Sequence, residues 1–398
     1  MIQSVPTLSQ SPIEDEFVQN PYRFYKEARR AGDLFRWAEY DRICAISNRS
    51  VNAFLRDRRW GREIPKEMKP EEPERLEPFN RLERCSMLEL DPPDHTRLRN
   101  LVLRAFTSRR ISALQTEIRD QAENILSELD GPEFELQHTL AEKLPVLVIA
   151  KLLGVPGEMA DQLLAWSHDM VAMYQAKRDR KIEDQAASAA SEFTSYIAQL
   201  IEFRRSQQGS DLISGLIAAE DTSGKLSSDE MVSTCILLLN AGHEATAYSI
   251  GNGVKTILES GHPHKELVAP SQIAATVEEV LRFDPPLHLF ERHAKEDMEM
   301  FGVSFKRGDT VAVLLAAANR DPLVFPDPET FNPFRKPSAN ASFGAGIHFC
   351  VGAPLARLEL STAFTSLFDR FPDLRLASPP RYANRFHFHG LESLRLSC

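Results

Sequence analysis

A single cysteine at position 350 lies where a glycine-containing loop meets a helix, and this junction constrains the chain more than any other stretch. Gly344, Ala345 and Gly346 predict a tight loop, and Pro354 suits the first turn of the helix that follows. Unpaired backbone N–H groups at a helix N-terminus favour negative charge, so we expect Cys350 to be held as a thiolate, the form that binds metal. An ordinary buried cysteine is the alternative interpretation.

A nucleotide-binding loop and a zinc site are both incomplete in this stretch. A nucleotide-binding loop would need a third glycine at the right spacing after Gly344 and Gly346, and none follows. A zinc site could use His348 and Cys350, but no second pair of ligands is nearby to complete the four that zinc requires.

The complete spacing is Phe, x, x, Gly, x, His, x, Cys, x, Gly, and it resembles the haem-binding signature of the cytochrome P-450 family. In that family the cysteine is the axial thiolate ligand of haem iron, which favours O–O cleavage. The resemblance therefore implies haem b (iron protoporphyrin IX) with Cys350 as its metal ligand. It also implies cofactor-binding roles for the neighbouring residues Phe343, Gly344, His348 and Gly352.

Asp91, Pro92 and Pro93 open a second informative segment, because Asp and Pro are good signals for a helix start. His95 and Arg99 are four residues apart and share one helical face, as a solvated polar pair would. The segment also resembles the family's D-P-P-x-H-x-x-x-R sequence, in which both side chains hold a haem propionate. The same resemblance implies a propionate-binding role for Arg292.

The composition is that of an ordinary globular protein: 398 residues, 42% hydrophobic and 26% charged. No linker, composition break or repeat divides it, so we expect residues 1–398 to form one mostly helical domain. Five scattered cysteines indicate a reducing compartment. The N-terminal stretch lacks a signal-peptide pattern and the apolar runs are too short to span a bilayer, which predicts a cytoplasmic protein without membrane segments. The net charge of −10 argues against nucleic acid as a partner.

An unusually long helix is predicted to start at a capping box formed by Ser227 and Glu230 and to run to about Glu259. Near its centre lies Gly242, at a cost of about 1 kcal/mol relative to alanine. Close helix packing is one interpretation of this glycine. The alternative is that Ala-Gly-x-Glu resembles the family's oxygen-binding helix, which implies that Ala241 and Gly242 leave space for O2 and that Glu244 relays protons.

The oxygen-helix pattern departs from the family at one position. The residue after the acid is usually threonine, whereas here Ala245 follows Glu244 and Thr246 comes next. The next residue on a helix points about 100° away, so Thr246 is poorly placed to replace the missing hydroxyl. We therefore expect water or substrate assistance, with Glu244 as the relay.

Glu279 and Arg282 form an E-x-x-R pair, a spacing that any surface helix can show. In the family this pair is structural and is locked to a later arginine, for which Arg335 is the matching residue. Substrate contacts are expected from mostly apolar residues, with His288 and His389 as polar groups: Leu238, His288, Leu289, Phe290 and Leu391. The stretch from Trp60 to Glu83 is rich in Pro, Glu and Arg and is predicted to be a long loop.

Together these features predict a mainly α fold with small β-sheets (α+β), the cytochrome P-450 fold, with haem between the long central helix and the helix after the cysteine loop. The implied function is a haem-thiolate monooxygenase that oxidises, and in particular hydroxylates, a small and largely hydrophobic organic substrate with O2. Two alternatives stay open. One is non-standard haem-thiolate chemistry (peroxygenase, coupling or substrate-assisted oxidation), because of Ala245; the other is a non-catalytic haem sensor.

No flavin or iron–sulfur segment is recognisable in the chain, so electrons should come from a separate partner. We expect a ferredoxin with its reductase, or a flavodoxin-type protein. Four arginines could form a basic docking patch, with scattered solvated charge as the alternative: Arg104, Arg109, Arg110 and Arg357. A monomer is expected.

Overall fold

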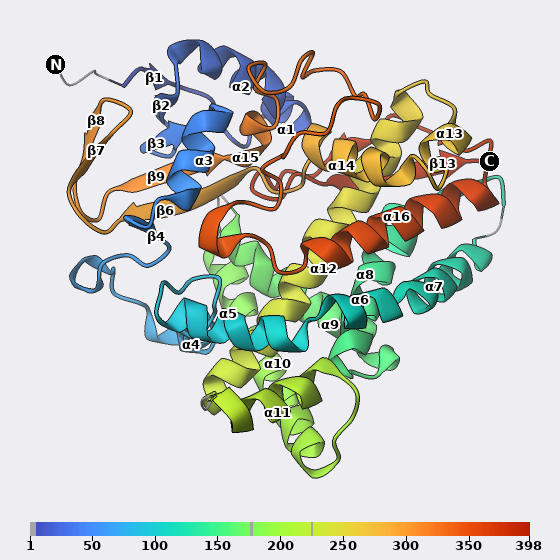
Figure 1. The fold of residues 1–398 in the computed structure, drawn as a ribbon, viewed down its shortest axis with the longest axis horizontal. Helices are drawn as coiled ribbons and strands as arrows, with labels where there is room; N and C mark the ends of the chain where they lie inside the picture. Colours follow the sequence, from blue (N-terminus) through green and yellow to red (C-terminus); the bar gives the residue numbers. More distant parts are fainter. Residues whose placement is uncertain (1–4, 130, 176–177, 224–225) are drawn as a thin grey trace.

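A computed structural model describes residues 5–129, 131–175, 178–223 and 226–398, and helices make up most of it (Figure 1). The small sheets gather mainly at one side, beside the N-terminal segment. The α-helices are α1 (Asp15–Gln19), α2 (Pro21–Ala28), α3 (Asn48–Arg56), α4 (Glu77–Arg84), α5 (Asp94–Ala105), α6 (Ser108–Ala113), α7 (Gln115–Ser127), α8 (Glu142–Leu153), α9 (Ala160–Val171), α10 (Arg180–Ser206), α11 (Leu212–Ser223), α12 (Ser228–Glu259), α13 (His264–Leu267), α14 (Ile273–Phe283), α15 (Leu315–Ala318) and α16 (Ala353–Arg370).

Short helical turns connect several of these helices: η1 (Arg29–Ala31), η2 (Lys66–Met68), η3 (Glu74–Leu76), η4 (Gln137–Ala141), η5 (Gly157–Met159), η6 (Ala172–Tyr174) and η7 (Gly346–His348). The strands are β1 (Thr7–Leu8), β2 (Leu34–Trp37), β3 (Arg42–Ala45), β4 (Trp60–Gly61), β5 (Glu133–Glu135), β6 (Leu289–Ala294), β7 (Met298–Met300), β8 (Val303–Phe305), β9 (Thr310–Leu314), β10 (Arg375–Leu376), β11 (Arg381–Tyr382), β12 (Leu391–Ser393) and β13 (Arg395–Ser397). The predicted mainly α fold with small sheets is confirmed.

The largest sheet has the order β1-β2-β3-β9-β6-β4 and mixes parallel and antiparallel pairs. In its centre β6 runs antiparallel to β9, with Phe290 opposite Val313 and Arg292 opposite Val311. Alternate residues of a strand point to opposite faces, so one face of this sheet packs on the cluster around Phe54 and the other on the aromatic cluster around Trp37. The sheet thereby fixes the direction of the β6 side chains.

The predicted capping box and long helix are confirmed by α12. The Ser227 hydroxyl accepts from the Glu230 amide at 3.1 Å, and the Glu230 carboxylate accepts from the Ser227 amide at 2.9 Å. The helix has 32 residues and runs through the middle of the molecule, packed against α8 and α16 (Figure 1). Most of its residues are buried, and its hydrophobic contacts belong to the largest core cluster.

The predicted loop from Trp60 to Glu83 is wrong in its last part, because α4 occupies residues 77–84. Phe79 and Leu82 are three residues apart, lie on one face of α4 and are both buried. Two apolar residues among many charged ones give too little helical periodicity for this helix to be predicted from the sequence. Among the described helices, none has the length and apolar character needed to cross a membrane.

Candidate active site

The cysteine loop from Phe343 to Gly352 leads directly into α16. It is closed by the Cys350 amide, which donates to the Phe343 carbonyl at 3.0 Å. Gly344 and Gly346 both have positive φ, +68° and +71°, a region that glycine adopts without strain. A Cβ on Gly346 would lie 2.2 Å from the Leu55 carbonyl oxygen, so only glycine allows the loop to approach α3 this closely.

Cys350 is exposed, and backbone amides of Gly352 and Ala353 hydrogen-bond to its sulfur from the first turn of α16. Burial of the sulfur among protein atoms nevertheless raises the pKa of the thiol, and this outweighs the lowering by those amides and by Arg99 and Arg357. The helix terminus acts in the expected direction, because the amides of Gly352 and Ala353 lower the pKa of the thiol. A bound cation would have to supply the remaining stabilisation.

A group of basic side chains lies near this loop without a matching set of acids. Arg292 is only 4% exposed, and the one hydrogen bond of its side chain among the described residues goes to the Glu291 carbonyl at 2.8 Å. Burial first, and Arg62 second, lower the pKa of Arg292 to about 9. Arg99 donates to the Phe349 carbonyl at 2.7 Å, which ties α5 to the cysteine loop.

The two predicted histidines, His95 and His348, meet in this group with ring centroids 4.2 Å apart. His95 Nδ1 and His348 Nε2 are buried and have no hydrogen-bond partner among the described residues. His348 Nε2 lies 3.9 Å from Asp91 Oδ1, beyond hydrogen-bond reach, and burial lowers the pKa of both histidines. Buried donors without acceptors are costly, so this group fits a ligand that carries carboxylates.

One face of α12 is accessible although the helix runs through the core. Ala241 is exposed, and Leu238 and Ala245 are partly exposed, at positions i, i+3 and i+7 of a single helical face. Gly242 lies off this face, since a Cβ there would meet Ile149 of α8 at 3.0 Å. The glycine therefore permits close packing of α8 against α12, as the first interpretation of its sequence position predicted.

The hydroxyl of Thr246 donates to the Gly242 carbonyl at 3.2 Å, four residues back along its own helix. Thr246 is 5% exposed, in contrast to the partly exposed Ala245. This orientation agrees with the geometric argument that Thr246 points away from the position that Ala245 occupies.

These features fit haem. An accessible cysteine receives two amide hydrogen bonds, buried basic side chains that no carboxylate hydrogen-bonds suit the two propionates, and small residues leave one face of α12 accessible. The chemistry of this donor set, one thiol sulfur and several cationic or imidazole groups, matches an iron porphyrin that carries two carboxylates.

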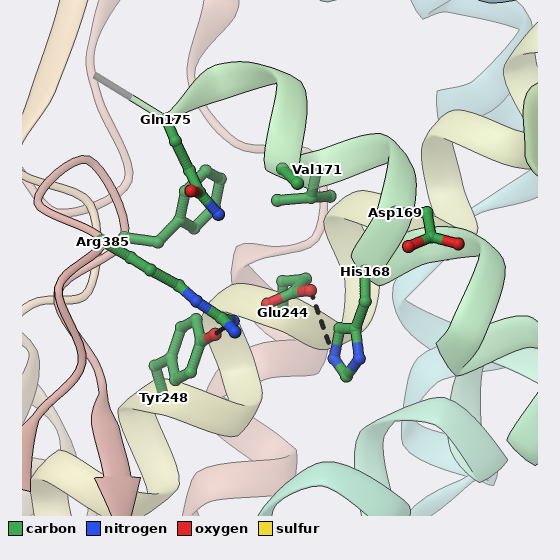
Figure 2. Close-up of a pocket in the computed structure, with 9 residues that line it drawn as sticks. His168, Asp169, Val171, Gln175, Glu244, Tyr248 and Arg385 are labelled. Carbon is green, nitrogen blue, oxygen red and sulfur yellow. Dashed lines mark hydrogen bonds and ion pairs between the residues drawn. The ribbon is translucent and has the colours of Figure 1, made fainter. Parts of the chain in front are cut away.

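A pocket lies beside α12 and is drawn in Figure 2. Helix α9 and the turn after it form one wall, α12 a second, and the segment between β11 and β12 a third. Its lining mixes charged, polar and apolar side chains: His168, Asp169, Val171, Ala172, Gln175, Glu244, Tyr248, Arg385 and Phe388.

Glu244 is 4% exposed, and one of its carboxylate oxygens lies 3.4 Å from His168 Nε2 (Figure 2). The same oxygen lies 3.9 Å from His243 Nε2, a buried atom with no hydrogen-bond partner among the described residues. Burial lowers the pKa of His243. The acid therefore borders both the pocket and two imidazoles, of which that of His243 is buried.

None of the expected substrate residues lines this pocket. Leu238 lies on α12, the helix that forms one of its walls, but its side chain is not part of the lining. Leu289 and Leu391 are 8% and 2% exposed and belong to hydrophobic clusters, and Phe290 packs against the cluster on the other sheet face. Only Leu238 shares the accessible face of Ala241.

The histidines at 288 and 389 take part in a buried polar network around Asp284. Tyr22 donates to Asp284 Oδ1 at 2.9 Å, Tyr382 donates to Oδ2, and His389 Nε2 lies 3.5 Å from Oδ1. His288 Nδ1 lies 3.0 Å from the Tyr25 hydroxyl. Both histidines are 2% exposed or less, so their side chains are occupied inside the fold rather than in the pocket.

The E-x-x-R pair is brought together with Arg335 as expected. Arg282 donates two hydrogen bonds of 2.8 Å to the Glu279 carboxylate, and Arg335 Nε donates to it at 2.9 and 3.0 Å. The Asn332 amide adds a further donor at 2.8 Å. This cluster joins α14 to the segment that precedes the cysteine loop.

Of the pocket residues, only Glu244 was named from the sequence; His168, Tyr248 and Arg385 are among those that were not. Arg385 lies in a segment without any motif, and Tyr248 lies one turn beyond the recognised part of α12. The aromatic and methionine spacing from Ala165 to Ala176 was the one available signal, and it is equally typical of core.

Comparison with known proteins settles the family. The model of the family described as "Cytochrome P450" matches residues 271–380. The polyketide biosynthesis cytochrome P450 PksS of Bacillus subtilis (strain 168) is 38% identical over 400 residues, covering 97% of this chain and 98% of that protein. The chain belongs to the cytochrome P450 family.

Other cytochromes P450 support the same assignment. The vitamin D(3) 25-hydroxylase of Pseudonocardia autotrophica is 38% identical over 91% of this chain and 89% of its own length. The crystal structure of P450BioI in complex with hexadec-9Z-enoic acid ligated acyl carrier protein superposes with a TM-score of 0.90 at 34% identity, covering 96% of this chain and 99% of that one. The protein is thus a cytochrome P450 monooxygenase, a family whose members act on a substrate and O2 with redox partners.

Proposed function

We propose that this cytochrome P450 oxidises a small, largely hydrophobic organic molecule, most simply by hydroxylation, with Cys350 as the iron ligand. The observation that supports this assignment best is the accessible Cys350, which receives amide hydrogen bonds from Gly352 and Ala353. When bound, haem supplies the activation of O2 and the insertion of one oxygen atom. The relatives' names mention polyketide biosynthesis and vitamin D(3) hydroxylation, which agrees with a hydrophobic substrate.

The chain's own residues hold and orient the cofactor in this proposal. His95, Arg99, Arg292 and His348 bind the propionates, which gives acceptors to the unpartnered histidine nitrogens and an anion to the buried Arg292. Gly352 and Ala353 tune the sulfur through their amides. Phe343 and Gly344 shape the loop. Such contacts act by position and charge, since the chemistry belongs to the cofactor.

Proton supply falls to Glu244 and its neighbours. The Glu244 carboxylate borders the pocket and lies within 3.4 Å of His168, so it can take a proton from the imidazole side and release it toward water in the pocket. Ala245 offers no hydroxyl, and that of Thr246 is engaged with Gly242. We propose a relay through Glu244 with ordered water or a polar group of the substrate.

The test of the ligand is spectroscopic. The purified protein should be coloured, and its reduced carbon monoxide complex should show the Soret shift that marks thiolate ligation. Cys350→Ala should lose that shift, while Cys235→Ala, at a buried cysteine of α12, should keep it. A colourless protein despite haem supplied during expression would overturn the proposal.

A second candidate, peroxide-driven oxidation, is favoured by Ala245 and by the hydroxyl of Thr246 donating to a backbone carbonyl. An enzyme that uses peroxide needs fewer protons delivered from the protein. Turnover with hydrogen peroxide in place of a reductase system distinguishes the two. Faster product formation with peroxide than with O2 and electrons would favour this candidate.

We further propose that electrons come from a separate acidic ferredoxin that docks on the cysteine side of the molecule. Helix α6 carries Arg109 and Arg110 and packs against α16, which begins after the cysteine. Arg357 contributes less, because it pairs with Glu278. Reversing the charges at 109 and 110 should slow reduction and weaken its salt dependence; an unchanged rate would refute the docking site.

The remaining proposals concern assembly. Residues 1–398 are proposed to act as one domain and as a monomer. Light scattering of the haem-loaded protein at several concentrations tests the monomer, and a constant mass near 45 kDa is the expected result, since the chain has 44.9 kDa. A mass that rises with concentration would contradict it.

A further inference from the structure

Arg385 is the arginine of the pocket in Figure 2, and it forms no ion pair among the described residues. It lies in the segment between β11 and β12, and its guanidinium donates one hydrogen bond to the Tyr248 hydroxyl at 3.0 Å. Among the described residues, no carboxylate lies within ion-pair distance of it. An arginine has five N–H donors in a fixed fork, so most of its donors stay available.

Arg385 is exposed, and the segment around it is anchored by a turn hydrogen bond and by a buried aromatic side chain. The Phe388 amide donates to the Arg385 carbonyl at 2.8 Å, and Phe386 is buried against Phe17 and Trp37. The guanidinium is therefore presented to the pocket by a fixed backbone, with Tyr248 of α12 orienting it from below. Such support reduces the entropy lost when the side chain binds a ligand.

The guanidinium stays charged in this setting. Burial acts to lower the pKa of Arg385, but the hydrogen bond with the Tyr248 hydroxyl and the charge of Glu244 oppose it, and the pKa is raised. Burial also raises the pKa of Tyr248, so the phenol keeps its proton and can itself donate a hydrogen bond. A charged fork beside a protonated phenol is a donor pair suited to a carboxylate.

The acids of the pocket are directed elsewhere. Glu244 has its close contact on the other side, with His168, and Figure 2 shows Asp169 beyond His168, at the opposite side of the view from Arg385. Val171, Ala172 and Phe388 supply an apolar surface in the same pocket. The lining therefore places the cation of Arg385 and apolar groups apart from its two acids, Glu244 and Asp169, which lie on the His168 side, and this arrangement matches an amphipathic acid.

We propose that Arg385 binds the carboxylate of an organic acid whose apolar part lies in the pocket of Figure 2, and that it thereby selects acids over neutral analogues. This inference rests on the haem-dependent oxidation proposed above, since it names the class of substrate for that site. Arg385 binds and positions the substrate; it takes no part in the oxidation step.

Binding measurements on the haem-loaded protein test this proposal with matched probes. The probes are saturated fatty acids from octanoic to hexadecanoic acid and the primary alcohols of the same chain lengths. Dissociation constants are measured twice, from the change in the haem absorption band and by equilibrium dialysis, which does not depend on haem. The wild type should bind at least one acid about tenfold more tightly than its alcohol, which corresponds to about 1.4 kcal/mol.

Three variants identify the residue responsible. Arg385→Gln should abolish the preference by weakening acid binding, with alcohol binding almost unchanged. Arg385→Lys should keep part of it, because the charge remains and the fork is lost. Arg381→Gln, in the strand β11 just before this segment, is the matched control: the Arg381 side chain is 59% exposed and pairs with Asp15, so the preference should stay.

Several results would overturn the proposal. They are equal binding of acids and alcohols by the wild type, a preference that survives in Arg385→Gln, or failure of every probe to bind. If Arg385→Gln does not fold, Tyr248→Phe replaces it and should weaken acid binding a few-fold by loosening the guanidinium. The carbon monoxide spectrum is recorded for each variant, so loss of the haem assignment is seen separately from loss of acid selectivity by dialysis.

Discussion

Replacing Glu279 with alanine should destabilise the fold more than any other single change in the E-x-x-R cluster. Its carboxylate accepts hydrogen bonds from Arg282, Arg335 and the Asn332 amide. The side chains of Glu279 and Arg282 are 3% and 2% exposed, so the substitution leaves a buried guanidinium without its acid. Breaking a buried pair in this way typically costs about 3–5 kcal/mol.

The structure places this case toward the lower end of that range. Arg282 keeps three backbone acceptors, the carbonyls of Asn319, Pro328 and Thr330, at 2.9 to 3.1 Å. We therefore expect a loss of about 3 kcal/mol in the free energy of unfolding. With a urea dependence of about 3 kcal/mol per molar, that loss lowers the unfolding midpoint by about 1 M.

The assay is urea denaturation of the haem-loaded protein, followed by circular dichroism and by the Soret band. The neighbouring Glu278→Ala is the matched control, because Glu278 pairs with Arg357 and both side chains are about two-fifths exposed, 44% and 38%. An exposed pair of this kind contributes less than about 1 kcal/mol. Equal midpoints for the two variants would refute the argument that burial makes the Glu279 cluster important.

Three further changes are expected to have distinct effects. Gly346→Ala should lower haem content and stability, because its Cβ would lie 2.2 Å from the Leu55 carbonyl; haem per protein after purification measures it. Burial raises the pKa of Glu83 to about 8, so the unfolded state releases this proton at a lower pH than the folded state does. The free energy of unfolding should therefore fall as the pH rises from about 4 to about 8, and Glu83→Gln should flatten that slope in thermal melts. Glu244→Ala should reduce product per reducing equivalent strongly and Thr246→Ala only mildly, and diversion of nearly all equivalents to peroxide in Thr246→Ala would contradict the relay.

The parts of the site that were predictable from the sequence are those whose partners are close along the chain. The loop around Cys350, the helix face of His95 and Arg99, and the capping box of α12 follow from local spacing alone. Local rules of hydrogen bonding and helix geometry fix these arrangements before the chain packs.

The parts that could not be predicted depend on how distant segments approach one another. Arg385 contacts Tyr248 of α12 across more than a hundred residues of sequence, and no local spacing predicts that contact. His288 and His389 looked like polar groups of a pocket, but Asp284 and two tyrosines enclose them in the fold. The pKa of the Cys350 thiol in the chain alone was not predictable for a similar reason, since burial comes from the whole fold and outweighs the lowering by the local helix terminus.

The absence of a hydroxyl at Ala245 and the presence of Arg385 in the pocket both affect how protons can be supplied. Ala245 is partly exposed and offers only a methyl group, while the hydroxyl of Thr246 donates to Gly242. The adjacent pocket wall offers Glu244 and, one turn later, Tyr248, which holds Arg385. A ligand whose acid group is fixed by Arg385 would bring a polar group to the same wall as Glu244. Because such a group can order water where Ala245 cannot, the carboxylate that we propose for selectivity also supports proton supply through Glu244.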